Sequence, residues 1–167
     1  MATISTLYKA GTSHQSTFNA VNNSYLVDNV IDLADVVTAK GSAIAQGDVI
    51  EALYLPAGTQ VLFAGLQVME VMTGTSTDAT VDLGITGGDV DAFVDGFDLD
   101  GAAAEAYATV ASAAVTPATF LSTADTLDIL VVTQTGTITG GKIRVFAHVL
   151  DVSDRKVQRP GIAQIGS

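Results

Sequence analysis

The 167-residue chain contains neither cysteine nor tryptophan. Without cysteine it has no disulfide, no thiolate nucleophile and no cysteine ligand for a metal ion. Its only large polar aromatic residues are four tyrosines, which offer little of the aromatic platform on which carbohydrate-binding grooves rely. Stability therefore has to come from packing, helped by any oligomerisation.

Positive charge is missing over most of the chain. No lysine or arginine occurs from Gly41 to Gly141, a stretch that holds thirteen of the eighteen acidic residues. The net charge is −11 at neutral pH. Nucleic-acid backbones are bound mainly through lysine and arginine, so we expect no nucleic-acid partner.

The composition predicts one globular domain with two tails. Hydrophobic residues make up 48% of the chain and charged residues 15%, values typical of a packed domain. We expect an extended N-terminal arm over residues 1–24, a β-domain over 25–151 and a C-terminal arm over 152–167. Neither a secretory signal in Met1–Ala10 nor a membrane-spanning segment is expected.

Apolar and polar residues alternate in several runs separated by turn residues, the pattern of half-buried strands. Parallel sheets would need crossover helices that the pattern lacks. We predict an all-β fold, an antiparallel β-sandwich that is jelly-roll-like and carries extended N- and C-terminal arms. The expected strands are Tyr25–Leu33, Val49–Leu55, Val61–Met72, Thr80–Ile85, Thr126–Thr135 and Lys142–Leu150.

For three of these strands and for one further segment, the sequence predicts more detail. Val61–Met72 is apolar on both faces except at Gln67 and Glu70, which predicts a central strand between two layers. Thr126–Thr135 and Lys142–Leu150 flank a glycine-rich turn and are predicted to form a hairpin. The alanine-rich segment 102–114 is either a short helix or, as we favour, a loop or edge strand.

The densest group of metal-binding residue types lies between Gly87 and Gly101. Carboxylate oxygens at this density can bind Ca²⁺. The spacing fails the EF-hand pattern, because a loop starting at the second aspartate has Phe93 in its third position and Ala102 in its twelfth. An acidic, solvated loop is the favoured interpretation and a Ca²⁺ site the less favoured one, with the candidate ligands Asp89, Asp91, Asp95, Asp98 and Asp100.

The same segment interleaves phenylalanines with its aspartates. Phe93 and Phe97 would be hydrophobic anchors for a subunit contact if they lay outside the core. The equally favoured alternative is that both side chains fold under the loop into the core.

Catalytic constellations are scarce. His148 shares a strand face with Lys142, Arg144 and Phe146, but no Gly-x-Ser-x-Gly elbow supplies a nucleophile. Asp82 and Asp128 could act as paired carboxylates, yet their alternating positions predict that both face solvent. We assign no catalytic residue and expect no enzyme.

Five of the seven basic residues lie in the last 26 positions, behind an acidic body. Opposite charges on tail and body favour docking of the tail on a neighbouring subunit or a larger partner. The expected contact residues are Arg155, Lys156 and Arg159.

The runs Asp48–Val61, Thr80–Ile85, Gly87–Gly101 and Thr126–Ile129 give the chain a resemblance to small structural proteins of tailed bacteriophages. Over about residues 25–152 it resembles head decoration, or cement, proteins. The resemblance implies a body on the outer face of the capsid, often a homotrimer, that binds the major capsid protein and has no active site or cofactor. It also implies a virion protein assembled in the reducing cytoplasm of a bacterial host.

One alternative function stays open at this point. A Ca²⁺-dependent extracellular or tail-fibre binding module would use the segment Asp89–Asp100 as its site. It predicts a large gain in stability with Ca²⁺, whereas a capsid-binding protein predicts little gain.

Overall fold

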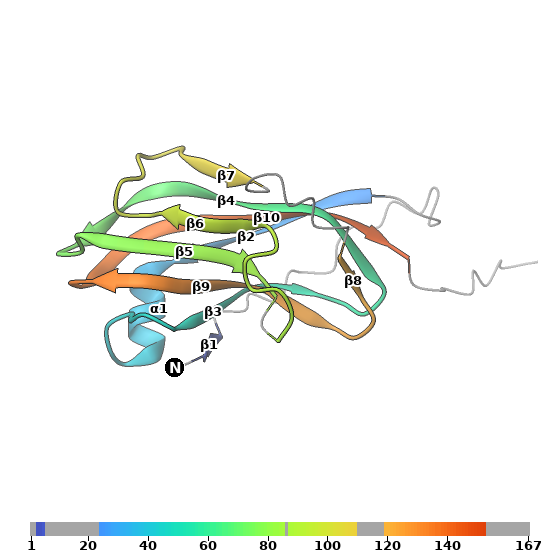
Figure 1. Ribbon diagram of the computed structural model, residues 1–167, viewed down its shortest axis with the longest axis horizontal. Helices are drawn as coiled ribbons and strands as arrows, with labels where there is room; N and C mark the ends of the chain where they lie inside the picture. Colours follow the sequence, from blue (N-terminus) through green and yellow to red (C-terminus); the bar gives the residue numbers. More distant parts are fainter. Residues whose placement is uncertain (1–2, 6–23, 86, 110–118, 153–167) are drawn as a thin grey trace, which may run out of the picture.

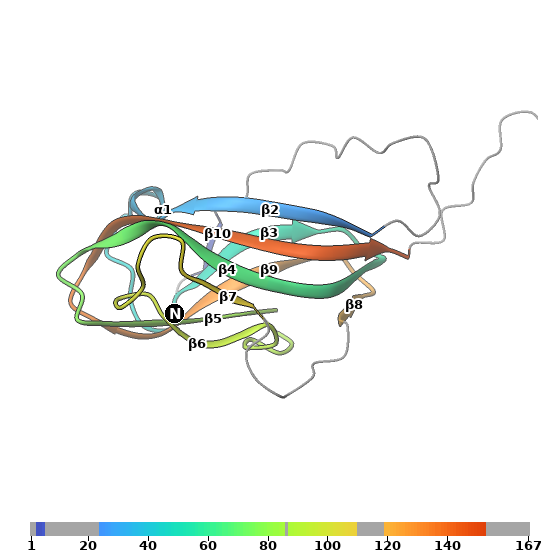
Figure 2. The ribbon, with the colours of Figure 1, turned by 90° about the horizontal axis from the view of Figure 1, so that it is seen from above.

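The computed structural model describes residues 3–5, 24–85, 87–109 and 119–152, and within them ten strands and one helix. The strands stack as two sheets, face to face (Figures 1 and 2). Their bounds are β1 Thr3–Ser5, β2 Ser24–Asp32, β3 Val49–Leu55, β4 Thr59–Gly74, β5 Asp78–Gly84, β6 Val94–Asp98, β7 Tyr107–Thr109, β8 Thr119–Leu121, β9 Asp125–Thr135 and β10 Ile138–Asp151, and helix α1 is Leu33–Lys40.

The first sheet, sheet A, has the strand order β1-β3-β9-β5-β6. The second, sheet B, has the order β2-β10-β4-β7, with β8 also paired to β4. β1 runs parallel to β3, and the other pairings between described strands are antiparallel. Of the predicted N-terminal arm, the structure describes β1 and Ser24, the first residue of β2. The predicted C-terminal arm lies outside the described residues after Val152.

The strand order is that of a jelly roll. β7 and β8 pair with successive stretches of β4, Gly65–Gln67 and Thr59–Val61, so together they occupy one edge position of sheet B. Counted this way from β2 to β10, the eight strand positions are ordered 1-8-3-6 in sheet B and 2-7-4-5 in sheet A. This is the arrangement of a two-sheet jelly roll. The predicted all-β, jelly-roll-like sandwich is confirmed.

The predicted hairpin between β9 and β10 is wrong. β9 pairs with β3 and β5 in sheet A, whereas β10 pairs with β2 and β4 in sheet B. The turn at Gly136 therefore carries the chain from one sheet to the other. The alternation of apolar and polar residues predicts which side chains face the core. The same alternation occurs whether two successive strands pair in one sheet or lie in opposite sheets across the core.

β4 is central in sheet B, as expected, but only one of its faces is buried. Its register with β10 shifts at four places, and at two of them Met69 and Leu62 are extra residues without a partner in the pairing. Both are exposed, at 40% and 41%. Two bulges thus explain why the segment is apolar on both faces in the sequence. The buried inner face consists of Val61, Ala64, Leu66 and Val68.

Helix α1 begins directly after β2, where the sequence analysis expected strand as far as Leu33. The Asp32 carboxylate accepts a hydrogen bond from the Ala34 amide at 2.9 Å and caps the N-terminus. Gly41, at φ 72°, ends the helix in a left-handed conformation and donates to two carbonyl oxygens of the last turn. No helix in the described part of the chain is long and apolar enough to cross a membrane.

The alanine-rich segment forms no helix in its described part. A turn precedes β7, and Tyr107–Thr109 is an edge strand on β4, which confirms the favoured alternative there. Residues 110–118 lie outside the described residues.

The core lies between the two sheets. Leu127 and Ile129 from sheet A and Leu66 and Val145 from sheet B are fully buried. Each belongs to a set of alternate residues along its strand, as the period-two pattern predicts. Any strand side chain that contacts a partner therefore has to lie on the outer face of one of the two sheets.

Candidate interaction surfaces

The aspartate-rich loop folds back over the outer face of sheet A. The Ile85 amide donates to the Asp89 carbonyl oxygen at 2.8 Å, and the Phe93 amide donates to the Leu83 carbonyl oxygen at 2.9 Å. A Cβ atom on Gly84 would lie only 2.2 Å from the Asp89 carbonyl oxygen, so this close approach requires glycine. The loop is thus pinned to β5 by backbone contacts.

The carboxylates of this loop do not converge on one point. A hydrogen bond between the side chains of Asp89 and Asp91 raises the pKa of Asp89 above its ordinary value. Asp98 instead accepts from the Gly101 amide at 3.0 Å, and Asp95 and Asp100 are exposed. Among the described residues, no group of three or more His, Cys, Asp or Glu could hold a metal ion.

The phenylalanines of the segment point inward. Phe93 is only 4% exposed and belongs to the core, and Phe97 is half-buried against it. This arrangement corresponds to the alternative in which both side chains fold under the loop. Phe93 is not available to a partner.

Asp82 was expected to face solvent, and this prediction is wrong: it is 7% exposed. It accepts a hydrogen bond from the Gly96 amide at 2.7 Å. Burial raises its pKa, and the nearby carboxylates of Asp95 and Asp91 add to the rise. The folded-back loop and the edge strand β6 together convert an outward-facing position into a buried one.

Asp128 is also buried, at 4% exposed, although its position predicted solvent exposure. It lies opposite Gly84 on one side and Glu51 on the other in the register of sheet A. Neither Asp82 nor Asp128 is exposed in the way that a pair of hydrolytic carboxylates would have to be to reach a substrate.

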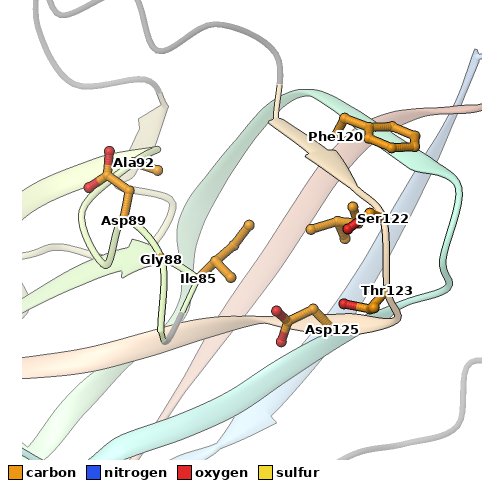
Figure 3. Close-up of a pocket in the computed structure, with 9 residues that line it drawn as sticks. Ile85, Gly88, Asp89, Ala92, Phe120, Ser122, Thr123 and Asp125 are labelled. Carbon is orange, nitrogen blue, oxygen red and sulfur yellow. The ribbon is translucent and has the colours of Figure 1, made fainter.

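A shallow pocket of about 230 Å³ opens beside the loop. Figure 3 shows Asp89 and Ala92 on one side, Ser122 and Thr123 on the other, and Ile85 and Asp125 between them. Its polar lining groups are carboxylates and hydroxyls, the remaining side chains, Phe120 and Leu121 among them, are apolar, and none of the described lining residues is a histidine, lysine or arginine. A hydroxyl without an adjacent base is not an activated nucleophile.

The outer face of sheet B is different in character. At the end of the sheet where β2 begins and β10 ends, apolar and aromatic side chains replace the polar residues expected on a solvated face. In the register, Leu26 lies opposite His148, which lies opposite Phe63, while Leu150 and Phe120 both lie opposite Gln60. We call this the sheet B patch and define it by Leu26, Phe63, Phe120, Phe146, His148 and Leu150.

Ring contacts organise the centre of the sheet B patch. The rings of Phe63 and Phe146 meet edge-to-face with centroids 6.3 Å apart, and Phe63 and His148 lie 5.6 Å apart. The Arg144 guanidinium lies 6.0 Å from the Phe146 ring centroid. At the periphery, Leu26 is 53% exposed and Phe120 is 55% exposed.

The other half of the same face carries paired ions. Arg144 Nε donates to Asp28 Oδ2 at 2.9 Å, and Lys142 Nζ lies 2.7 Å from Glu70 Oε2. The hydrogen bond and charge of Glu70 raise the pKa of Lys142. Two of the three lysines and arginines among the described residues thus lie on this face, each beside a carboxylate.

The sequence analysis noted that His148, Phe146, Arg144 and Lys142 share one face of a strand, but it did not find the sheet B patch. Leu26, Phe63 and Phe120 come from β2, β4 and β8, and only strand pairing brings them beside β10. The alternation in 142–150 was the one signal that could have pointed to this surface. The predicted contact residues Arg155, Lys156 and Arg159 lie outside the described residues.

Comparison with known proteins places this fold among phage capsid chains. No protein-family model matches the sequence, and no curated protein matches it significantly. A chain in the structure of the cyanophage Pam1 capsid asymmetric unit superimposes with a TM-score of 0.55 at 19% identity, covering 85% of this chain and 98% of the other. A chain in the capsid of Ralstonia phage GP4 gives 0.54 at 18% identity, covering 77% and 84%.

These matches define a class by fold: a jelly roll of the kind found in phage capsid structures. The similarity to structural proteins of phage heads that the sequence predicts is confirmed at this level. At 18–19% identity the likeness concerns the backbone arrangement, and the role of each surface has to be argued from its own residues.

Proposed function

We propose that the protein is a structural component of a phage virion that binds the outer surface of the capsid and stabilises it. The observation that carries this proposal is the fold, shared over more than three quarters of the chain with chains of two phage capsids. The proposed partner is the major capsid protein. A resident metal or cofactor has no part in it.

The surface chemistry supports a binding role over catalysis. The pocket beside the aspartate loop joins carboxylates to hydroxyls and has no basic lining residue among those described. The sheet B patch exposes apolar side chains and is suited to contact with a partner. We therefore propose that the protein is not an enzyme.

Stabilisation by such a protein follows from mass action. A protein that binds the assembled shell, and not its separated subunits, adds its binding free energy to the cost of dismantling the shell. We propose a homotrimer, because an oligomer that contacts several capsid subunits at once gains avidity without tight individual contacts. Assembly in a bacterial cytoplasm fits a chain without cysteine.

The arms, residues 1–24 and 152–167, are proposed as the contacts to the shell or to neighbouring subunits. The C-terminal arm holds Arg155, Lys156 and Arg159, whereas the chain as a whole has a charge of −11. Electrostatic complementarity of this kind directs a basic tail onto an acidic surface.

Co-sedimentation with purified phage heads tests the proposal. The full chain is mixed with heads of the phage that encodes it, after its own copies have been stripped off. We expect saturable binding and a higher temperature of head disruption. A variant truncated after Val152 should bind at least about tenfold more weakly, and Asp100→Asn, an exposed loop change, is the matched control. Absence of binding by the full chain would overturn the proposal.

Thermal unfolding in EDTA and in millimolar Ca²⁺ separates the alternative function. A capsid-binding protein should melt at the same temperature in both. A rise of many degrees with Ca²⁺, lost in Asp89→Asn and Asp91→Asn, would instead support the Ca²⁺-dependent binding module.

A further inference from the structure

The sheet B patch has no cover among the described residues. Leu26 and Phe120 leave more than half of their side-chain surface exposed, and Leu62, at the neighbouring bulge, is 41% exposed. On the outer face of sheet A, by contrast, the loop after β5 covers the end of that strand at Gly84. An apolar face that the fold leaves open in a chain rich in aspartate and threonine calls for a partner.

The charge pattern indicates which partner. A second copy of this chain carries the same charge of −11, so most pairs of faces would repel each other. The outer face of sheet B differs, because it holds two of the three lysines and arginines among the described residues. Arg144 lies beside Asp28, and Lys142 lies 2.7 Å from Glu70 and 3.9 Å from Asp32. Two copies therefore repel each other less through this face than through a face without cations.

The ends of the described domain support the same partner. Ser24, where β2 begins, lies opposite Leu150, and β10 ends at Asp151 beside it. The described chain thus ends next to the sheet B patch, and the sequence that follows it, residues 153–167, contains three basic side chains. In a contact through this face, they would start close to the acidic body of the neighbouring copy.

We infer that the sheet B patch is the contact through which copies of this chain associate. The Phe63–Phe146 pair forms its centre, Leu26 and Phe120 lie at its periphery, and the Arg144–Asp28 pair adjoins it. The inference rests on the proposed homo-oligomer and names the face that holds it together. A symmetry axis beside the patch brings the same face of every copy into one contact.

The test compares two aromatic side chains of similar exposure on opposite sheets. Phe120→Ser removes a ring from the sheet B patch, and Tyr54→Ser removes the 49% exposed ring of Tyr54 in sheet A. Mass is measured by light scattering during size-exclusion chromatography over a series of concentrations. We expect the wild type and Tyr54→Ser to form a homo-oligomer, and Phe120→Ser to raise its dissociation constant at least about tenfold.

Leu26→Ser is the second variant at the sheet B patch, and Val71→Ser, on β4 outside it, is its control with 44% exposure. Circular dichroism must show that each variant keeps the fold. A monomeric wild type at all concentrations, or an oligomer that dissociates equally in the Tyr54 and Phe120 variants, would overturn the inference.

The two proposals fail in different ways. A wild-type monomer that still co-sediments with phage heads keeps the proposed function and overturns the inference. An oligomer that dissociates only in the Phe120 and Leu26 variants, but binds no heads, keeps the self-contact and overturns the capsid role.

Discussion

The outer faces of the two sheets differ in the side chains that they carry and in what covers those side chains. Sheet A carries carboxylates on its outer face, and the loop after β5 folds back over it, so that Asp82 is buried and accepts a backbone hydrogen bond. Sheet B carries rings and aliphatic side chains, and no described segment covers them. The loop thus covers part of the outer face of sheet A, whereas the apolar part of the outer face of sheet B stays open among the described residues.

The largest effect is expected from removing the cover of sheet A. Gly84→Ala would place a Cβ atom 2.2 Å from the Asp89 carbonyl oxygen and 2.3 Å from the Val90 carbonyl carbon, so the loop must move away. We expect a loss of about 2–3 kcal/mol in the free energy of unfolding, measured by urea denaturation.

The control for this change lies in the same loop. A Cβ atom on Gly88 would meet its nearest neighbour at 3.6 Å, an ordinary contact. Gly88→Ala should therefore change stability by less than about 0.5 kcal/mol. Equal losses in both variants would show that the loop does not depend on its close approach to β5.

A smaller effect, of opposite sign, is expected at the buried carboxylate. Asp82 has a raised pKa in the folded state, so its contribution to stability is present below the pKa of the unfolded chain and is lost as the pH rises through the folded pKa. Asp82→Asn keeps an acceptor for the Gly96 amide and removes the buried charge. We expect a gain of about 0.5–1 kcal/mol at neutral pH.

The measurement is the unfolding free energy of Asp82→Asn as a function of pH. The gain over wild type should shrink as the pH is lowered towards that of an ordinary aspartate. Asp100→Asn changes the net charge by the same amount at an exposed position and should show neither effect. A gain that does not depend on pH would argue against the buried charge as its cause.

The smallest effect is expected at the paired ions of sheet B. Asp28 and Arg144 are 43% and 31% exposed, so solvent screens their attraction. Asp28→Asn should lower the unfolding free energy by about 0.5 kcal/mol or less, and the difference should vanish at about 1 M salt. A salt-independent loss above about 1.5 kcal/mol would mean that this pair holds the sheet together rather than balancing the charge of its surface.

The positions of the strands could be predicted because alternation is a local signal. β3 was predicted with its observed bounds, Val49–Leu55, since a strand with one face in the core repeats every two residues. α1 was missed although Asp32 and Gly41, its capping residues, were both visible in the sequence. An eight-residue helix directly after a strand is too short to show a stripe of its own.

The candidate surfaces were less predictable, for one physical reason. Asp82 was expected to face solvent because the two-residue period of a strand assigns each side chain to one face of its sheet. The period does not indicate whether another segment covers that face. The members of the sheet B patch come from four strands. Phe120 and Leu150 lie on the same face, on either side of β4, only because β8 and β10 pair with the same residue, Gln60.

The sequence by itself determined that this chain is an acidic, cysteine-free β-protein and where most of its strands run, because composition and period are properties of single segments. The tertiary structure alone decided that β9 and β10 belong to different sheets, that Phe93 and Asp82 are buried and that Phe63, Phe146 and His148 form one apolar surface. Pairing and packing join residues far apart in the chain, and no local pattern encodes the partner across a sheet or the loop that covers it.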